Sequence, residues 1–359
     1  MPLPSFRFLV RLPFVVLLAA PGFAATHRTE RSSPTPAAES GAYHGAIAID
    51  ATTGRVLFED HADVQNPPAS VAKLMTFLVV ADKIKRGELA LDALVTIPAQ
   101  AAKMGGSEAW LMDKEKVSVQ ELLYLLMVQS ANDAAMALAI SSSGSRDAFV
   151  ELMNARARQL GMTHTEFHSP HGLPPSRGQL PDLTTARDLA ILSRELIAKT
   201  DILRYTSTRE HEFRHANGRV NKFENHDHLL GLMPGCDGLK TGWYAKAGYS
   251  IATTVQRNGR RVIVVVLGCP QRVERDTIAT RLVERGFSAL PPAPANPAPP
   301  AAGSVVASPL PPAAAPSAPA NPAPSDLKPV PLTPEDKQAL ESGGDSGPAV
   351  HVDLTKPKH

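Results

Sequence analysis

The sequence predicts a mixed α/β fold in which helices flank one antiparallel sheet and form a helical lobe beside it. Three observations lead to this prediction. Strand patterns lie near the start, at 45–50 and 55–58, helical patterns fill the middle, and three strands and a helix follow between 238 and 287. Layered domains bury the apolar faces of such elements against one another, so the early and late strands should share one sheet. We expect a single domain at 43–288.

The expected strands are short runs of apolar and β-branched residues that end at turn residues. The first two form a hairpin that turns at 51–54 (ATTG). The last three lie at 238–244, 248–257 and 261–268, and the turn at 258–259 is Asn-Gly, which is a strong hairpin signal. These three strands therefore form a predicted meander.

The expected helices are recognised by apolar residues that recur every three or four positions. The first opens at Ser70, directly after Pro67-Pro68-Ala69, and stops at Gly87. The expected helical stretches are 70–86, 118–161 with breaks near Ser130 and at 141–144, 184–199, and 273–287.

The two ends of the chain have compositions that do not build a core. Arg7 and Arg11 are followed by an apolar stretch at 12–20 and small residues at 22–24, which predicts a signal peptide at 1–24. The alternative is a retained N-terminal anchor, but a spanning helix needs about 20 apolar residues. The remaining expected segments are a flexible lead at 25–42 and a disordered Pro/Ala-rich tail at 289–359.

The composition describes an ordinary globular protein. A net charge of +2 with 20% charged residues excludes nucleic acid as a partner. No later segment is long and apolar enough to cross a bilayer, so we expect no stable membrane anchor after signal cleavage and a place in the periplasm or cell-wall space.

Cys236 and Cys269 flank opposite ends of the meander, roughly 25 Å apart at about 3.3 Å per residue, so both thiols should be free.

Three short motifs carry the candidate chemistry. Each is weak by itself, since S-x-x-K or S-x-N occurs about once in a chain of this size by chance. What matters is that each lies on an element suited to its chemistry. The motifs are Ser70-Val71-Ala72-Lys73, Ser130-Ala131-Asn132 and Lys240-Thr241-Gly242.

Ser70 and Lys73 are one helical turn apart, so hydroxyl and amine can meet. A serine becomes a nucleophile when a base takes its proton, and lysine can be that base if burial or a nearby cation lowers its pKa. Lys240 is the candidate cation. N–H groups at the helix start could stabilise an oxyanion. The strand of Lys240 could pair with a substrate backbone, and Gly242 would leave that edge clear.

Together the motifs resemble the signature of penicillin-binding proteins and serine β-lactamases, with S-x-N replacing S-D-N. Their surroundings are similar to the low-molecular-mass D-alanyl-D-alanine carboxypeptidases over about 43–288. The resemblance implies a β-lactamase/transpeptidase-like fold. The segments that carry it are 68–76 (PASVAKLMT), 129–135 (QSANDAA), 170–174 (PHGLP), 185–188 (TARD), 237–242 (DGLKTG) and 247–249 (AGY).

The resemblance implies that Ser70 attacks the carbonyl between two terminal D-alanines and forms an acyl-enzyme, while Lys73 accepts the proton. Ser130 relays a proton to the departing D-alanine amine. The oxyanion hole is formed by the backbone N–H groups of Ser70 and Trp243. No metal and no cofactor are implied.

The resemblance also implies substrate contacts. Asn132 holds the substrate amide, Lys240 and Thr241 engage the terminal carboxylate, and Arg275 is a candidate further carboxylate contact. Many relatives carry a histidine just before the Thr-Ala-Arg-Asp segment, whereas here the run is Pro181-Asp182-Leu183-Thr184-Thr185, so the substrate contacts of that loop stay open. Many also have a C-terminal β-domain and a membrane-binding helix, and we expect neither here.

Three other patterns suggest different chemistry and are set aside. The H-E-x-x-H motif at 211–215 binds zinc only on a helix, whereas this segment alternates as a strand and ends in Asn-Gly at 217–218. The histidines and aspartate at 226–228 are expected to be surface residues near a loop. Glu166 is expected to be an exposed strand carboxylate and not a deacylation base.

The leading interpretation is a serine D-alanyl-D-alanine carboxypeptidase that trims peptidoglycan stem pentapeptides and is covalently inhibited by penicillins and other β-lactam antibiotics. The first alternative is a D,D-endopeptidase, which would cut cross-links with the same residues. A β-lactamase would need deacylation machinery that the sequence does not reveal. A non-catalytic penicillin sensor would need signalling helices.

Overall fold

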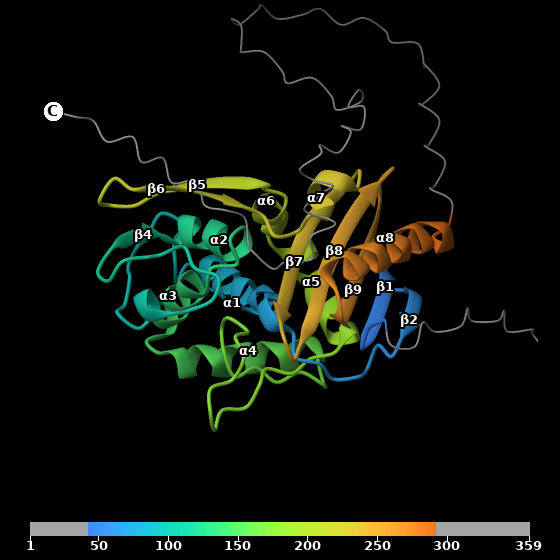
Figure 1. Ribbon diagram of the computed structural model, residues 1–359, viewed down its shortest axis with the longest axis horizontal. Coiled ribbons are helices and arrows are strands. Elements are labelled where there is room, and N and C mark those ends of the chain that lie inside the picture. Colours follow the sequence, from blue (N-terminus) through green and yellow to red (C-terminus); the bar gives the residue numbers. More distant parts are fainter. Residues whose placement is uncertain (1–41, 292–359) are drawn as a thin grey trace, which may run out of the picture. The chain divides into compact units, whose positions relative to one another are not determined.

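A computed structural model of the chain describes residues 42–291. Five antiparallel strands form its main sheet, and the first and last segments share that sheet as predicted (Figure 1). The predicted signal peptide at 1–24 lies outside the described residues, as do nearly all of the predicted lead at 25–42 and tail at 289–359. In sheet order the strands are β2 (Val56–Asp60), β1 (Gly45–Asp50), β9 (Arg260–Cys269), β8 (Gly248–Arg257) and β7 (Cys236–Tyr244).

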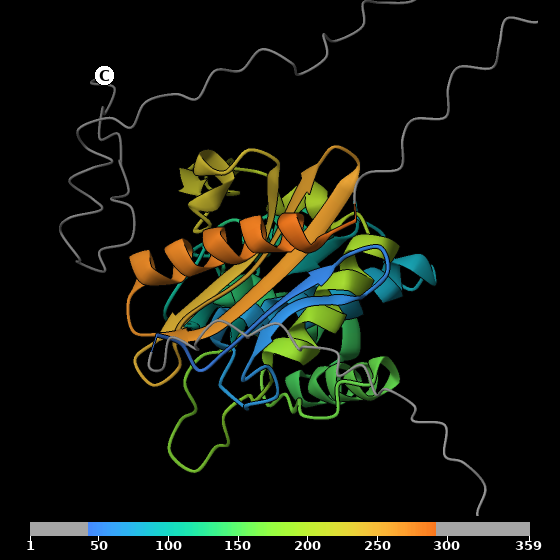
Figure 2. The same cartoon turned by 90° about the vertical axis from the view of Figure 1, so that its right-hand side faces the viewer.

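The sheet has two apolar faces, because successive residues of a strand point to opposite sides. Along β9, Val262, Val264 and Val266 pack with helix α8 (Arg272–Ala289), which crosses one face of the sheet in Figure 2. Ile263 and Val265 point the other way, into the core shared with α1 (Lys73–Lys85) and α5 (Ala186–Lys199). This double burial explains the nearly continuous valine run of β9.

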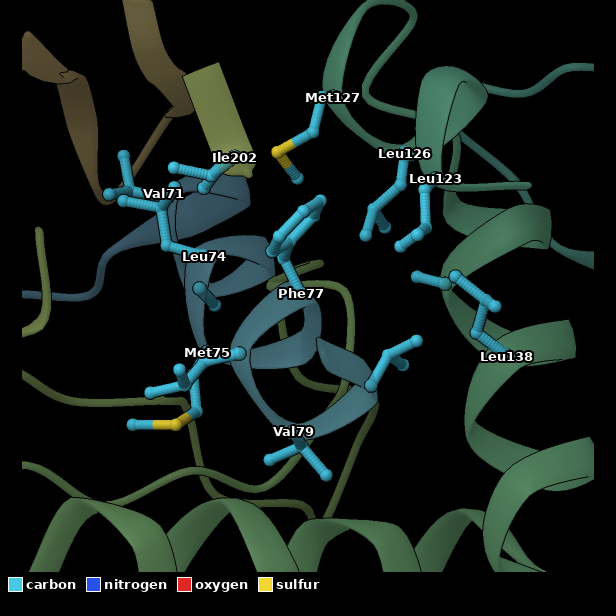
Figure 3. Packing of buried hydrophobic residues seen from close by; sticks show 14 of the residues in the cluster. Val71, Leu74, Met75, Phe77, Val79, Leu123, Leu126, Met127, Leu138 and Ile202 are labelled. Carbon is cyan, nitrogen blue, oxygen red and sulfur yellow. The ribbon is translucent and has the colours of Figure 1, made fainter. Parts of the chain in front are cut away.

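The helical lobe lies beside the β7 edge of the sheet, and α1 runs between the two (Figure 1). Residues 73–80 of α1 are buried on every side, as expected of a helix enclosed by other elements. Phe77 shows this in Figure 3, where its ring points among Leu123, Leu126 and Ile202. The lobe helices are α2 (Val119–Met127), α3 (Asn132–Ser143) and α4 (Arg146–Leu160).

The predicted meander and helices are confirmed, but several short elements were not predicted. Each is too brief to show a period. Ser70 also lies in a 3-10 turn, and the α-helix proper begins at Lys73 and not at Ser70. The additional elements are η1 (Ala69–Ala72), β3 (Leu94–Thr96), η2 (Ala101–Lys103), β4 (Lys116–Ser118), α6 (Ile202–Thr206) and α7 (Leu229–Leu232).

Two further sequence expectations can be compared with the structure. Cys236 is the first residue of β7 and Cys269 the last of β9, and both are free thiols as predicted. Between residues 42 and 291, no helix combines the length and the apolar character needed to cross a membrane.

The H-E-x-x-H segment is strand β5 (Glu210–Arg214) and pairs with β6 (Val220–Glu224), as its alternating pattern predicts. Gly218 in the connecting turn has a φ of 83°. The two histidines of the motif contact carboxylates of other segments: His211 Nε2 lies 2.9 Å from Glu121, and His215 Nδ1 lies 3.1 Å from Glu115.

The contact between His215 and Glu115 fixes the β5–β6 hairpin to the segment 97–116. Glu115 is buried, and its carboxylate accepts hydrogen bonds from the N–H groups of Met112 and Ala216. Asn221 Nδ2 lies 3.0 Å from His215 Nε2, so this network fits a neutral imidazole whose Nδ1–H donates to Glu115. The segment held in this way supports Asn132, as described below.

We predict that Glu115→Gln lowers the free energy of unfolding by about 1–3 kcal/mol, because one buried N–H loses its acceptor. Burial raises the pKa of Glu115, but hydrogen bonds from Met112, Ala216 and His215 outweigh it and hold the pKa below its ordinary value of 4.5. The carboxylate therefore stabilises the fold above about pH 4.5, and this contribution is lost as the pH falls through the lower, folded-state pKa.

Urea unfolding of wild type and variant at pH 7 and pH 3.5 would measure this difference, which should shrink at the lower pH. Glu212→Gln is the matched control, because Glu212 lies on the same hairpin with its side chain 62% exposed. Equal losses in the two variants would show that Glu115 does not anchor the hairpin.

Candidate active site

The amine of Lys73 is the centre of the candidate site. Lys73 is fully buried at the start of α1. Its Nζ donates to Ser70 Oγ at 2.9 Å, to Asn132 Oδ1 at 2.7 Å and to the carbonyl oxygen of His171 at 2.7 Å. Burial and the charge of Lys240 hold the pKa of Lys73 well below its ordinary value of 10.5. A neutral amine has two N–H groups, which can donate to Asn132 and His171, so its lone pair is left to accept the Ser70 proton and the amine can act as a general base.

Ser70 lies on a strained turn that packs against other backbone. Ala69 has a φ of 49°, which is uncommon for a residue with a side chain. Gly172, with a φ of 79°, approaches so closely that a Cβ there would lie 1.9 Å from the carbonyl oxygen of Ala69. Backbone strain of this kind persists where surrounding contacts determine it, and it is common at active sites.

Ser130 and Asn132 lie at the junction of α2 and α3, where the sequence predicted a helix break. Ser130 has a φ of 59°, and its buried hydroxyl has no hydrogen-bond partner among the described residues. Asn132 Nδ2 donates to the carbonyl of Gly105 at 2.7 Å, and its backbone N–H donates to the carbonyl of Ser107 at 2.8 Å. Asp133 accepts from the N–H of Ala109 and so holds the same segment.

Strand β7 forms the other wall of the site at the open edge of the sheet. Lys240 is buried, and its Nζ donates to the carbonyl of Thr241 at 3.0 Å. Gly242 lies against the backbone of Ser70: a Cβ there would lie 2.8 Å from Ser70 N, so only glycine allows this approach. Trp243 is exposed, and its ring stacks on Tyr249 with centroids 5.4 Å apart.

Burial lowers the pKa of Lys240 to about 7; the charge of Asp227 opposes this shift, and the smaller effect of Arg275 adds to it. Arg275 is buried in α8, and its guanidinium donates to Asp276 at 2.8 and 2.6 Å. These two bonds use Nε and Nη2, while Nη1 lies 3.5 Å from the carbonyl oxygen of Ser250. A direct contact of Arg275 with a carboxylate ligand stays a prediction.

The expectation that 226–228 would be surface residues is wrong for Asp227. Asp227 is buried, and one of its carboxylate oxygens has no hydrogen-bond partner among the described residues. Burial raises its pKa to about 6, although Arg275 opposes this shift. The side chain of Asn225 accepts from the N–H of Asp227 and donates to the carbonyls of Thr206 and Thr208, which turns the loop inward. Glu166, by contrast, is exposed and bridges to Leu183, as expected.

Sequence reasoning missed two groups that contact the site through backbone carbonyls, those of His171 and Gly105. A carbonyl is common to every residue, so the residue types gave no direct signal for these contacts. The structure therefore brings Ser70, Lys73 and Asn132 into direct contact and places Gly242 against the backbone of Ser70.

The chain matches a family model described as D-alanyl-D-alanine carboxypeptidase over residues 29–271. It is 32% identical over 243 residues to D-alanyl-D-alanine carboxypeptidase DacF of Bacillus subtilis, covering 68% of this chain and 61% of DacF. It is 34% identical to DacC of Escherichia coli, covering 76% of this chain and 66% of DacC. The chain thus spans about three fifths to two thirds of the length of these two relatives.

Two further comparisons concern other members of this group. A D-alanyl-D-alanine endopeptidase of Pseudomonas aeruginosa is 33% identical, over 66% of this chain and 74% of its own length. Among solved structures, ampicillin-bound penicillin-binding protein D2 of Listeria monocytogenes matches with a TM-score of 0.61 and 32% identity. That match covers 68% of this chain and 97% of the Listeria chain.

We predict that Lys240→Met raises the pKa of Lys73, because it removes a positive charge while it keeps a long side chain. Titration of protein labelled with 13C at the lysine Cε, followed by NMR, would measure the shift. Lys246→Met, at an exposed position two residues beyond β7, should leave the pKa of Lys73 unchanged. The same Lys73 pKa in wild type and Lys240→Met would rule out this electrostatic coupling.

Proposed function

This chain belongs to the D-alanyl-D-alanine carboxypeptidase family, and from that premise we propose that it removes the terminal D-alanine from peptidoglycan stem pentapeptides through an acyl-enzyme on Ser70. One observation carries the proposal. The buried Lys73 amine, with a pKa held well below 10.5, lies 2.9 Å from Ser70 Oγ. A serine beside a lysine of this kind is suited to acyl transfer.

The reaction begins when Ser70 Oγ attacks the carbonyl carbon between the two D-alanines while Lys73 takes the hydroxyl proton. The resulting oxyanion accepts hydrogen bonds from the N–H groups of Ser70 and Trp243. The C–N bond then breaks, and the leaving amine gains a proton through Ser130, whose buried hydroxyl has no partner in the described part of the chain. Lys73 is neutral again once its proton has passed through Ser130 to the leaving amine, and it then takes a proton from water. The resulting hydroxide attacks the ester carbonyl, and Ser70 leaves with that proton returned to its Oγ.

In this proposal, β7 and Asn132 bind the substrate. The open edge of β7 pairs with the substrate backbone, and Lys240 and Thr241 bind the terminal carboxylate. Asn132 Oδ1 already accepts from Lys73, and one N–H of its Nδ2 donates to Gly105. Its second amide hydrogen is the one that can reach the substrate amide.

The same chemistry makes β-lactam antibiotics inhibitors that acylate Ser70, in keeping with the ampicillin-bound Listeria relative. The reaction uses no metal and no cofactor. An exported enzyme in the periplasm or cell-wall space would meet its substrate there.

A D,D-endopeptidase is the second candidate function, since the Pseudomonas relative carries that name and covers 66% of this chain. Both activities cleave the same D-alanyl bond type with the same residues. They differ in what leaves: a free D-alanine, or a second stem peptide joined through its side-chain amine.

The proposal predicts free D-alanine from purified stem pentapeptide, measured by mass spectrometry of the products. Ser70→Ala should abolish both this release and covalent labelling by fluorescent penicillin, while Ser288→Ala, at an exposed site near the end of α8, should keep both. Separation of cross-linked muropeptides with no D-alanine from pentapeptide would favour the endopeptidase. Labelling that survives in Ser70→Ala would remove Ser70 from its role.

We further predict that kcat/KM for pentapeptide falls above about pH 7, approaching tenfold per unit, because Lys240 must be protonated to bind a carboxylate and its pKa is about 7. In Lys240→Arg the guanidinium stays charged, so this alkaline limb should move to higher pH. Steady-state rates between pH 5 and pH 10 would measure both profiles. An identical limb in the two enzymes would mean that another group titrates.

A further inference from the structure

Asp182 is a buried carboxylate that the proposed mechanism does not use. It lies in the loop before α5 and is 6% exposed. One carboxylate oxygen accepts from the N–H groups of His168 and Ser169, and the other accepts from Ser169 Oγ at 2.7 Å. Three donors from two adjacent residues thus converge on this one side chain, so it fixes the start of the turn at 169–172.

Ser169 passes this restraint along the turn. Its hydroxyl donates to Asp182 and accepts from the N–H of Gly172 at 2.8 Å, which closes the turn. Between these two residues, the carbonyl of Pro170 accepts from Thr76 Oγ1 at 2.6 Å, and the carbonyl of His171 accepts from Lys73 Nζ. The turn is therefore held by α1 on one side and by Asp182 on the other.

The same turn touches the backbone of the nucleophile. A Cβ on Gly172 would lie 1.9 Å from the carbonyl oxygen of Ala69 and 3.1 Å from Ser70 N. A displacement of the turn would therefore move the Lys73 acceptor and the packing surface of Ser70 together. Among residues 42–291, Asp182 is the one carboxylate that hydrogen-bonds to this turn.

We propose that Asp182 is a positioning residue of the acyl-transfer reaction: its carboxylate holds the turn 169–172 so that the carbonyl of His171 fixes the Lys73 amine against Ser70. The inference rests on the function proposed above. Asp182 acts through the turn and contacts neither substrate nor reacting atoms.

The charge of Asp182 also affects the pKa of Lys73, which can be measured. Lys240 on β7 lowers the pKa of Lys73, whereas Asp182 and Asp133 of α3 raise it. The imidazoles of His171 and His226 are also within the electrostatic reach of Lys73, and burial lowers the pKa of each to about 3, so both are neutral near pH 7. A variant that removes the Asp182 charge should therefore lower the pKa of Lys73.

Asp182 has charged neighbours of its own. Burial raises its pKa above the ordinary 3.8, and the hydrogen bonds from His168 and Ser169 oppose that shift. The side chain of His168 pairs with Glu166 at 3.4 Å, and Tyr244 of β7 has a pKa raised by burial and by Asp182. The three hydrogen bonds that converge on its two oxygens favour the ionised carboxylate, whose charge acts on Lys73.

Two variants distinguish the charge of Asp182 from the hydrogen bond that links Ser169 to Gly172. Asp182→Asn has nearly the same shape but loses the charge and one acceptor oxygen, while Ser169→Ala keeps the charge and breaks the link to Gly172. The readout is the second-order rate of acylation by fluorescent penicillin between pH 5 and pH 9. Asp147→Asn, on α4 with its side chain 80% exposed, is the matched control.

Both variants should acylate at least tenfold more slowly at their optimal pH, with melting temperatures near that of wild type. The acid limb of the rate should move to lower pH in Asp182→Asn, because Lys73 loses its proton more easily. It should stay in place in Ser169→Ala, and Asp147→Asn should behave as wild type. A purely structural role would lower the melting temperature without moving the limb.

The role of Asp182 would be overturned by wild-type acylation rates in both variants. It would also be overturned if Asp182→Asn acylated slowly but the acid limb of its pH–rate profile stayed where it is in wild type. If Asp182→Asn does not fold, a wild-type rate in Ser169→Ala would overturn it as well. Failure of wild-type protein to be labelled at Ser70 would instead overturn the proposed function, so the two failures are distinguishable.

Discussion

The site depends on one buried amine and the three oxygens that surround it. The acceptors of Lys73 come from the η1 turn, from the start of α3 and from the turn at 169–172. Each is fixed by its own contacts: Ser70 by Gly172 and Gly242, and Asn132 by the segment that contains Gly105. Burying a polar amine is unfavourable unless its hydrogen bonds are made. The burial of Lys73 therefore holds three separate elements together.

Two lysines of the same chemistry acquire different roles from their surroundings. Lys73 and Lys240 are both buried, and their mutual repulsion makes it unfavourable for both to be charged. Asp227 opposes the pKa shift of Lys240, and Asp182 opposes that of Lys73. Near neutral pH, this arrangement allows one amine to serve as a base while the other remains a cation. Environments that separate the pKa values of like groups are a general means of assigning acid and base.

Much of the fold could be predicted because its signals are local. The meander was predicted from apolar runs and the Asn-Gly turn, and the meeting of Ser70 and Lys73 followed from their spacing. What could not be predicted depends on where loops turn in space. Asp227 was expected at the surface, yet the side chain of Asn225 directs it inward. Asp182 was noticed only as part of the run 181–185, which departs from a family pattern, and its three hydrogen bonds appear once the turn is folded.

The restraints on Asn132 explain how the site can keep the Ser130 hydroxyl without a hydrogen-bond partner in the part of the chain that the structure describes. The segment 97–116 is held twice, by Asp133 through the N–H of Ala109 and by Glu115 through the β5–β6 hairpin. A buried hydroxyl without a partner costs about 1–3 kcal/mol, and the positive φ of Ser130 adds strain. The contacts of Asn132 and Asp133 fix the junction of α2 and α3. The fold therefore tolerates the cost of burying the Ser130 hydroxyl without a hydrogen-bond partner among the described residues. The hydroxyl is left able to hydrogen-bond to an amine that enters the site, as proton relay to a leaving group requires.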